Sequence, residues 1–202
     1  LYDVGEEHGT PYFVMEKLSG ESLSLILRRV RRVPLAEVRE LVVEVAAGLE
    51  HALAAEVVHR DLKPQNLFRI ESGRWKILDF GVSKLGEGAT LTRGQAVGTP
   101  GYMAPEQIRG DRVDHRADVF ALTAVAYRCL TGVPPFAGDQ ARILYQVLHA
   151  QPRKPAVPLP RDVELVLALG LAKSASERFA SASALADPFA AAADKRFWEG
   201  VG

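Results

Sequence analysis

The ten-residue stretch VVHRDLKPQN at 57–66 contains five side chains whose types and spacing could do chemistry. They are His59, Arg60, Asp61, Lys63 and Asn66. The carboxylate of Asp61 could orient a hydroxyl group and accept its proton. In an extended segment Lys63, two residues on, points to the same side, where a cation balances negative charge on a transferred group. The amide oxygen of Asn66 is a hard ligand that suits a divalent cation.

A second acidic residue, Asp79, lies near the end of the strand-like run WKILDF at 75–80. It offers an ionised oxygen for the same cation, and Gly81 frees the backbone to turn sharply after it. A base, a cation and two oxygen ligands, with no evident nucleophile, suit phosphoryl transfer, where positioning and charge neutralisation carry most of the catalysis. Each residue alone also has an ordinary explanation, since Asp61 and Asn66 are common turn formers and lone lysines are usually solvated.

The composition narrows the class of protein. The 202 residues suit one domain or one large lobe, with enough chain to bury a core. Lys and Arg number 25 and so do Asp and Glu, which argues against binding to nucleic acid or an anionic membrane by bulk charge. The single cysteine, Cys129, excludes an internal disulfide and suits a reducing cytosol. No signal peptide and no run of eighteen apolar residues is present, so we expect a cytoplasmic location.

The elements that must position these residues follow from periodicity and turn signals. Residues 1–5 and 12–17 resemble strands around a polar turn, EEHGTP, and 66–70 and 75–80 predict a second hairpin around ESG. Apolar residues at three-and-four spacing predict a helix at 35–55. Further helices are expected at 117–131, 139–149, 161–173 and 181–193. Few strands followed by many helices indicate an α+β fold.

Three motifs occur in an order that is typical of one family. HRDLKPQN at 59–66, DFG at 79–81 and APE at 104–106 resemble the catalytic loop, magnesium loop and closing motif of protein kinases. The resemblance covers nearly all of residues 1 to about 190 and is greatest to bacterial Ser/Thr kinases of the eukaryotic-like kind. It implies a mostly helical large lobe with two short hairpins and a small lobe that is largely missing. Residues 1–17 would be a small-lobe remnant, 18–193 the hinge and C-terminal lobe, and 194–202 a tail.

The resemblance implies that ATP and Mg²⁺ are the cofactors and gives each chemical residue a role. Asp61 would be the catalytic base, and Lys63 would contact the transferred phosphate. Asn66 and Asp79 would bind magnesium. The family also needs a glycine-rich loop and a strand lysine, yet no such loop occurs and the first lysine is Lys17. Because the chain begins with Leu1 rather than Met, we expect that its front is truncated and that these 202 residues alone are inactive.

The resemblance places the nucleotide against the segment YFVMEKLSGESL at 12–23. The backbones of Glu16 and Leu18 would bind adenine, with Met15 as a buried gatekeeper. Glu21 would hold the ribose hydroxyls. Phe68 would form the floor under adenine, where the family usually has an aliphatic residue.

Five further residues would be structural in the same comparison. His59 and Phe80 would stack in a spine that links the lobes, and neither would act as a catalyst. Asp118, in ADVFAL, would anchor the backbone of the catalytic loop. Glu106 of the closing motif and Arg178 of SERFAS would form a buried ion pair.

Residues 79–106 are the candidate activation segment. Arg60, beside Asp61, resembles the arginine that holds a phosphorylated residue of this segment in many kinases. We expect the phosphorylated residue to be Thr92, with Thr90 as the second choice; the alternative is that both merely belong to an ordinary loop. Lys63 after HRDL, and Thr99 in GTPGY, match the Ser/Thr pattern rather than the tyrosine-kinase one.

The sequence therefore predicts a Ser/Thr protein kinase that acts on protein hydroxyl groups, with ATP and protein substrates as partners and dimerisation for autophosphorylation left open. A pseudokinase or kinase-fold binding scaffold is the alternative, and the presence of Asp61, Asn66 and Asp79 argues against it. A small-molecule phosphotransferase is a second alternative, which GTPGYMAPE at 98–106 disfavours. We expect no nucleic-acid partner and no membrane segment within the chain; an anchor beyond Gly202 is left open.

Overall fold

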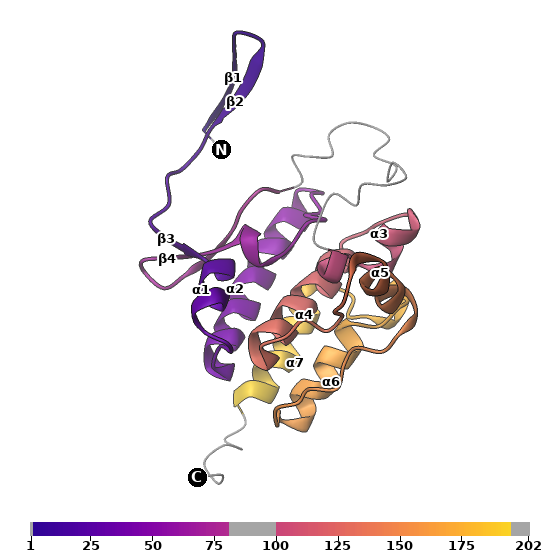
Figure 1. The fold of residues 1–202 in the computed structure, drawn as a ribbon. Helices are drawn as coiled ribbons and strands as arrows, with labels where there is room; N and C mark the ends of the chain where they lie inside the picture. The colour runs from indigo at the N-terminus through magenta and orange to yellow at the C-terminus, as the bar shows by residue number, and fades with distance from the viewer. Residues whose placement is uncertain (1, 81–99, 195–202) are drawn as a thin grey trace.

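A computed structural model describes residues 2–80 and 100–194 of the chain. Within these ranges the chain forms a helical body, a small sheet along one side of it and a hairpin that stands away from both (Figure 1). The α+β prediction is confirmed. None of the helices in the described ranges is long and apolar enough to cross a membrane.

The first hairpin pairs β1 (Asp3–Glu7) with β2 (Thr10–Val14) in antiparallel register. Its turn is His8–Gly9, and both residues have positive φ, 52° and 77°. Two-residue turns of this kind match the twist of the flanking strands. The predicted six-residue turn is therefore wrong, because the strands continue into EEHGTP and need only two residues to reverse.

The apolar side chains of the first hairpin are exposed. Tyr2 is 72% exposed, Phe13 45% and Met15, which follows β2, 57%. Figure 1 shows the hairpin projecting from the helical body on an extended connection. The expectation that Met15 is buried is wrong for the described residues, since the hairpin lies apart from the core.

A three-stranded antiparallel sheet lies next to the first two helices. Its order is β3 (Gly20–Ser22), β4 (Leu67–Ile70), β5 (Trp75–Ile77). The predicted hairpin of β4 and β5 is confirmed, whereas β3 was not predicted. A Cβ atom at Gly20 would lie 2.1 Å from the Arg69 carbonyl oxygen, so only glycine allows this close pairing.

The helical body is built around α4 (Arg116–Thr131), whose residues are nearly all buried. A helix that is buried on every side forms the centre of a fold rather than its surface. Around it lie the remaining helices of the described ranges: α1 (Leu23–Arg29), α2 (Leu35–Ala54), α3 (Pro105–Arg109), α5 (Gln140–His149), α6 (Arg161–Gly170) and α7 (Ala182–Asp194). The predicted long helices are confirmed within about three residues at each end, whereas the short α1 and α3 were missed.

Three single 3₁₀ turns complete the described elements: η1 (Pro64–Asn66), η3 (Pro100–Tyr102) and η4 (Ala175–Glu177). η1 forms the end of the polar stretch at 57–66 and leads directly into β4. The polar stretch thus lies between the end of α2 and the small sheet, and the first turn of α4 is packed beneath it.

Candidate active site

The backbone of the polar stretch is fixed from below by Asp118, in the first turn of α4. Its two carboxylate oxygens accept hydrogen bonds of 2.8 Å each from the backbone N–H groups of His59 and Arg60. Burial raises the pKa of Asp118, and the two N–H bonds act in the opposite direction. The carboxylate therefore ties two consecutive residues of the stretch to the most buried helix of the described structure.

His59 links this stretch to the chain just after β5. Its Nδ1 accepts from the Asp61 N–H at 3.2 Å, so the ring proton lies on Nε2, 2.9 Å from the Leu78 carbonyl oxygen to which it donates. The ring also contacts Phe80, with centroids 5.0 Å apart and planes tilted by 59°. His59 is fully buried, and these contacts use both of its nitrogens. The imidazole therefore serves as a structural link rather than an exposed acid or base.

Asp61, Lys63 and Asn66 meet on the exposed side of this frame. Lys63 Nζ lies 2.7 Å from Asp61 Oδ2, and Lys63 has extended backbone angles, as the same-side argument requires. Asn66 Nδ2 donates to the Asp61 carbonyl oxygen at 3.0 Å. The Asp61 carboxylate remains 43% exposed, so a substrate hydroxyl can reach it.

Asp79 is brought to the same place by the ends of β4 and β5. The strands pair Leu67 with Ile77, and the Leu78 N–H donates to the Asn66 carbonyl oxygen at 2.8 Å. Asp79 therefore follows the residue that faces Asn66. Its φ of 54° turns the chain sharply away from the strand direction. The pairing therefore brings the backbone of Asp79 close to that of Asn66, and carboxylate and amide oxygens are ligands that suit a divalent cation.

A buried ion pair lies between α3 and the segment before α7. Arg178 Nη1 and Nη2 lie 2.6 and 2.8 Å from the two carboxylate oxygens of Glu106. The side chains are 0% and 10% exposed respectively. Arg178 also donates to the Ala172 carbonyl oxygen at 2.8 Å and lies 5.0 Å from the Phe120 ring centroid. The pair joins two segments that are 72 residues apart in the chain.

The site thus has the exposed carboxylate of Asp61, the ammonium group of Lys63 paired with it, and a backbone held by Asp118. A comparison with known families shows where such an arrangement occurs. A family model described as the protein kinase domain matches residues 1–190. The chain belongs to the protein kinase family.

Curated relatives are named as kinases of one kind. The chain is 37% identical over 192 residues to serine/threonine-protein kinase PknD of Mycobacterium tuberculosis, covering 92% of this chain and 29% of that protein. It is 36% identical over 198 residues to PknA of Mycobacterium tuberculosis, covering 95% and 46%. For PknH of Mycobacterium bovis the identity is 35% over 191 residues, covering 92% and 32%. The chain thus spans between about a third and a half of the length of these relatives.

In the predicted hinge segment, the carboxylates of Glu16 and Glu21 each form an ion pair with a cationic side chain. Glu16 accepts from Lys76 Nζ at 2.6 and 2.7 Å. Glu21 forms a bidentate pair with Arg29 at 2.7 and 2.9 Å, and the hydrogen bond from Arg29 lowers the pKa of Glu21. A ribose-binding role for Glu21 would thus have to share this side chain with Arg29. Sequence reasoning missed α1, the helix that carries Arg29.

The predicted adenine floor is connected to the hinge by a residue that sequence reasoning also missed. Phe68 on β4 pairs with Lys76 on β5, so their side chains lie on the same face of the sheet. Lys76 then reaches Glu16 across 60 residues of chain. The sequence did contain a signal for this contact. Side chains alternate between the two faces of a strand, so WKILDF places Lys76 opposite Phe68 once the hairpin register is known. The adenine-binding role of Leu18 stays a prediction.

The predicted residues of the activation segment fall outside this description. Thr90, Thr92 and Thr99 all lie in 81–99, beyond the described residues. Their possible partner Arg60 is described, and its φ of 64° is the left-handed conformation that non-glycine residues seldom adopt.

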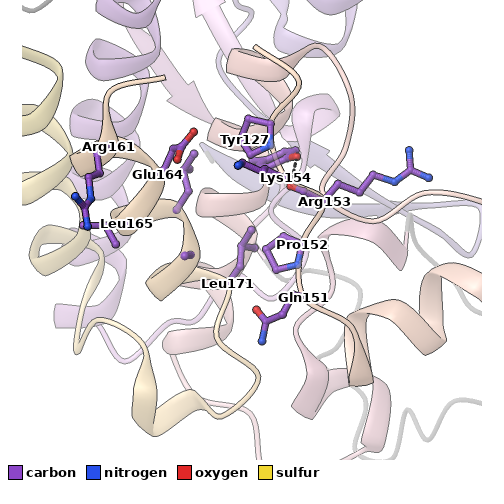
Figure 2. Close-up of a pocket in the computed structure, with 12 residues that line it drawn as sticks. Tyr127, Gln151, Pro152, Arg153, Lys154, Arg161, Glu164, Leu165 and Leu171 are labelled. Atoms are coloured by element: carbon purple, nitrogen blue, oxygen red, sulfur yellow. Dashed lines mark hydrogen bonds between the residues drawn. The ribbon is translucent and has the colours of Figure 1, made fainter. Parts of the chain in front are cut away.

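A cavity of about 350 Å³ lies away from the kinase site (Figure 2). Figure 2 shows it between Tyr127 of α4, Leu165 of α6 and the loop that carries Pro152. None of the predicted catalytic, nucleotide-binding or metal-binding residues lines it.

Proposed function

We propose that this chain is the large lobe of an ATP-dependent protein kinase that transfers the γ-phosphate of ATP to Ser or Thr hydroxyl groups of proteins. The observation that carries this proposal is the contact of Asp61 with Lys63 and Asn66 on a backbone that Asp118 fixes. Phosphoryl transfer depends chiefly on positioning and charge neutralisation, and this arrangement supplies both. The names of the curated relatives support the Ser/Thr class.

Each catalytic residue has a distinct part in this reaction. Asp61 orients the substrate hydroxyl and accepts its proton as the phosphoryl group is transferred. Lys63, paired with Asp61 at 2.7 Å in the absence of substrate, neutralises charge on the transferred phosphate. Asn66 and Asp79 would hold Mg²⁺, which would offset the negative charge of the ATP phosphates.

The nucleotide is proposed to lie between the hinge and β4. The backbones of Glu16 and Leu18 would bind adenine, and Phe68 would lie beneath its ring. Glu21 would reach the ribose if its bidentate contact with Arg29 opens, which is inexpensive because the pair is exposed. The proposed domain limits are 1–17 for the small-lobe remnant, 18–193 for the hinge and large lobe, and 194–202 for the tail.

Regulation by phosphorylation of Thr92, or else Thr90, is part of the proposal, with Arg60 as the binding partner of the phosphate. Autophosphorylation within a dimer, a cytoplasmic location and the absence of a nucleic-acid partner are likewise proposed. Mass spectrometry of the active full-length protein tests the phosphorylation site, and an unmodified 81–99 segment in fully active protein would contradict it.

A transfer assay with three acceptors tests the function. Full-length protein is incubated with γ-labelled Mg-ATP and, in parallel, a Ser/Thr protein, a Tyr peptide and a set of small hydroxyl compounds. We expect label in phosphoserine or phosphothreonine only. Label in a small molecule would replace the proposal by a small-molecule phosphotransferase, and nucleotide binding without transfer to any acceptor would replace it by a binding scaffold.

A further inference from the structure

The side chain of Gln107, in the first turn of α3, contacts the catalytic segment directly. Its Oε1 accepts from the Ala104 N–H at 2.9 Å, and its Nε2 donates to the Arg60 carbonyl oxygen at 2.7 Å. Gln107 is 8% exposed, and 47 residues separate it from Arg60. Both ends of the amide are thus used, one within α3 and one outside it.

The second of these bonds falls on the peptide group that precedes the proposed catalytic base. The carbonyl oxygen of Arg60 and the N–H of Asp61 belong to one planar peptide unit. Gln107 holds the oxygen at 2.7 Å, and His59 Nδ1 holds the N–H at 3.2 Å. The plane that carries Asp61 is therefore fixed on both edges by side chains.

These hydrogen bonds hold Arg60, whose backbone conformation is unfavourable by itself. Arg60 has a φ of 64°, a conformation that costs free energy for any residue with a Cβ atom and persists only when its surroundings impose it. Asp118 binds the Arg60 N–H at 2.8 Å, so Arg60 is held at its amide by α4 and at its carbonyl by α3.

We infer that Gln107 is a positioning residue for phosphoryl transfer: it orients the Arg60–Asp61 peptide so that the Asp61 carboxylate faces the substrate hydroxyl. The inference rests on the proposed function. The neutral side-chain amide accepts from Ala104 and donates to Arg60 at once. An ionised carboxylate of the same shape keeps the first bond but sets an acceptor against the Arg60 oxygen.

Capping of α3 does not explain the contact with Arg60. Ala104 has no side-chain acceptor, so Gln107 supplies only one half of a capping arrangement, through Oε1. The Nε2 bond leaves the helix altogether. It couples the start of α3, just after residues 81–99, to the segment that carries Asp61.

The first experiment measures steady-state kinetics of full-length protein with Gln107→Glu and Gln107→Met. We expect kcat to fall by about 10- to 100-fold, the cost of a displaced catalytic group, while KM for ATP changes less than about twofold. Gln146→Glu is the matched control. Gln146, on α5, accepts from the Ala137 N–H at 3.3 Å and donates to the Ala137 carbonyl oxygen at 2.9 Å, so both ends of its amide are likewise used, in a part of the structure without proposed catalytic residues.

The second experiment needs no activity. Amide hydrogen exchange at Asp61 is followed by NMR in the wild type and in Gln107→Glu, corrected for the intrinsic pH dependence. Burial and the facing carbonyl oxygen raise the pKa of the introduced carboxyl group, so at about pH 5 it is protonated and can donate. We expect wild-type protection at about pH 5 and faster exchange at about pH 8 in Gln107→Glu, with no such pH effect in Gln146→Glu.

The two experiments separate the inference from the proposed function. If the wild type transfers no phosphate to any acceptor, the proposed function fails, and the exchange measurement still decides whether Gln107 orients Asp61. If Gln107→Glu keeps wild-type kcat, or keeps wild-type exchange at Asp61 at both pH values, the inference is overturned.

Discussion

Replacing Arg178 by alanine would leave the carboxylate of Glu106 without its partner in the interior. Glu106 is 8% exposed and receives both of its guanidinium bonds, at 2.6 and 2.8 Å, from Arg178. The substitution also removes the donor to the carbonyl oxygens of Ala172 and Arg116, at 2.8 and 3.1 Å. We therefore expect Arg178→Ala to destabilise the large lobe strongly.

The magnitude follows from the burial of the pair. Removing one partner of a buried, hydrogen-bonded ion pair typically costs about 3–5 kcal/mol, because the remaining charge is desolvated and unpaired. In a chain of this size each kcal/mol lowers Tm by about 2–4 °C. The expected decrease in Tm is thus about 6–20 °C.

Urea unfolding followed by circular dichroism measures the change, with Arg29→Ala as the control. Arg29 and Glu21 form a bidentate pair of similar length, at 2.7 and 2.9 Å, but their side chains are 64% and 34% exposed. Water screens exposed pairs, so Arg29→Ala should change stability little. Equal losses in the two variants, or a Tm of Arg178→Ala unchanged within error, would refute the argument from burial.

Two further predictions concern the metal site and pH. Asp79→Ala should weaken binding of Mg-ATP by at least about tenfold, or about 1.4 kcal/mol, and leave metal-free ATP binding unchanged; titration calorimetry with and without EDTA measures this, and equal losses under both conditions would contradict the assignment. Lys173 donates to the carbonyl oxygens of Gln146 and Val147, and burial among arginines lowers its pKa from 10.5 to about 8. Because the unfolded chain then binds this proton more tightly, the stability of the wild type relative to Lys173→Met should rise between about pH 7 and pH 9.5, and a constant difference in urea unfolding would count against it.

The long helices and the second hairpin could be predicted because their signals are local. Leu41, Val42 and Val45 of α2 recur at helical spacing and are buried as expected. β3 and α1 could not be found in the same way. β3 has only three residues, and its partner β4 lies nearly fifty residues further along the chain, so its strand character comes from tertiary pairing.

The candidate site was predictable in its chemical residues and in part of its frame, since Asp118 was expected to anchor the catalytic loop, but not in the contact that Gln107 makes. The motif around Asp61 identified the chemical groups, and the structure places Lys63 and Asn66 beside it. The contact of Gln107 with Arg60 has no local signal, since it depends on how α3 packs against a segment 47 residues earlier. Whether Met15 is exposed depends on how the first hairpin packs against the rest of the chain. The residues next to Met15 in the sequence do not determine that packing.

The central claim is that Asp61 is the base of a phosphoryl transfer to Ser or Thr. Asp61→Asn in the full-length protein tests it most directly, because the amide preserves the shape of the side chain and removes its charge and proton affinity. Transfer from γ-labelled Mg-ATP to a Ser/Thr protein is measured beside Mg-ATP affinity and Tm. We predict that kcat falls by about 10²–10⁴-fold while affinity and Tm stay close to those of the wild type. Wild-type turnover in Asp61→Asn would contradict the account.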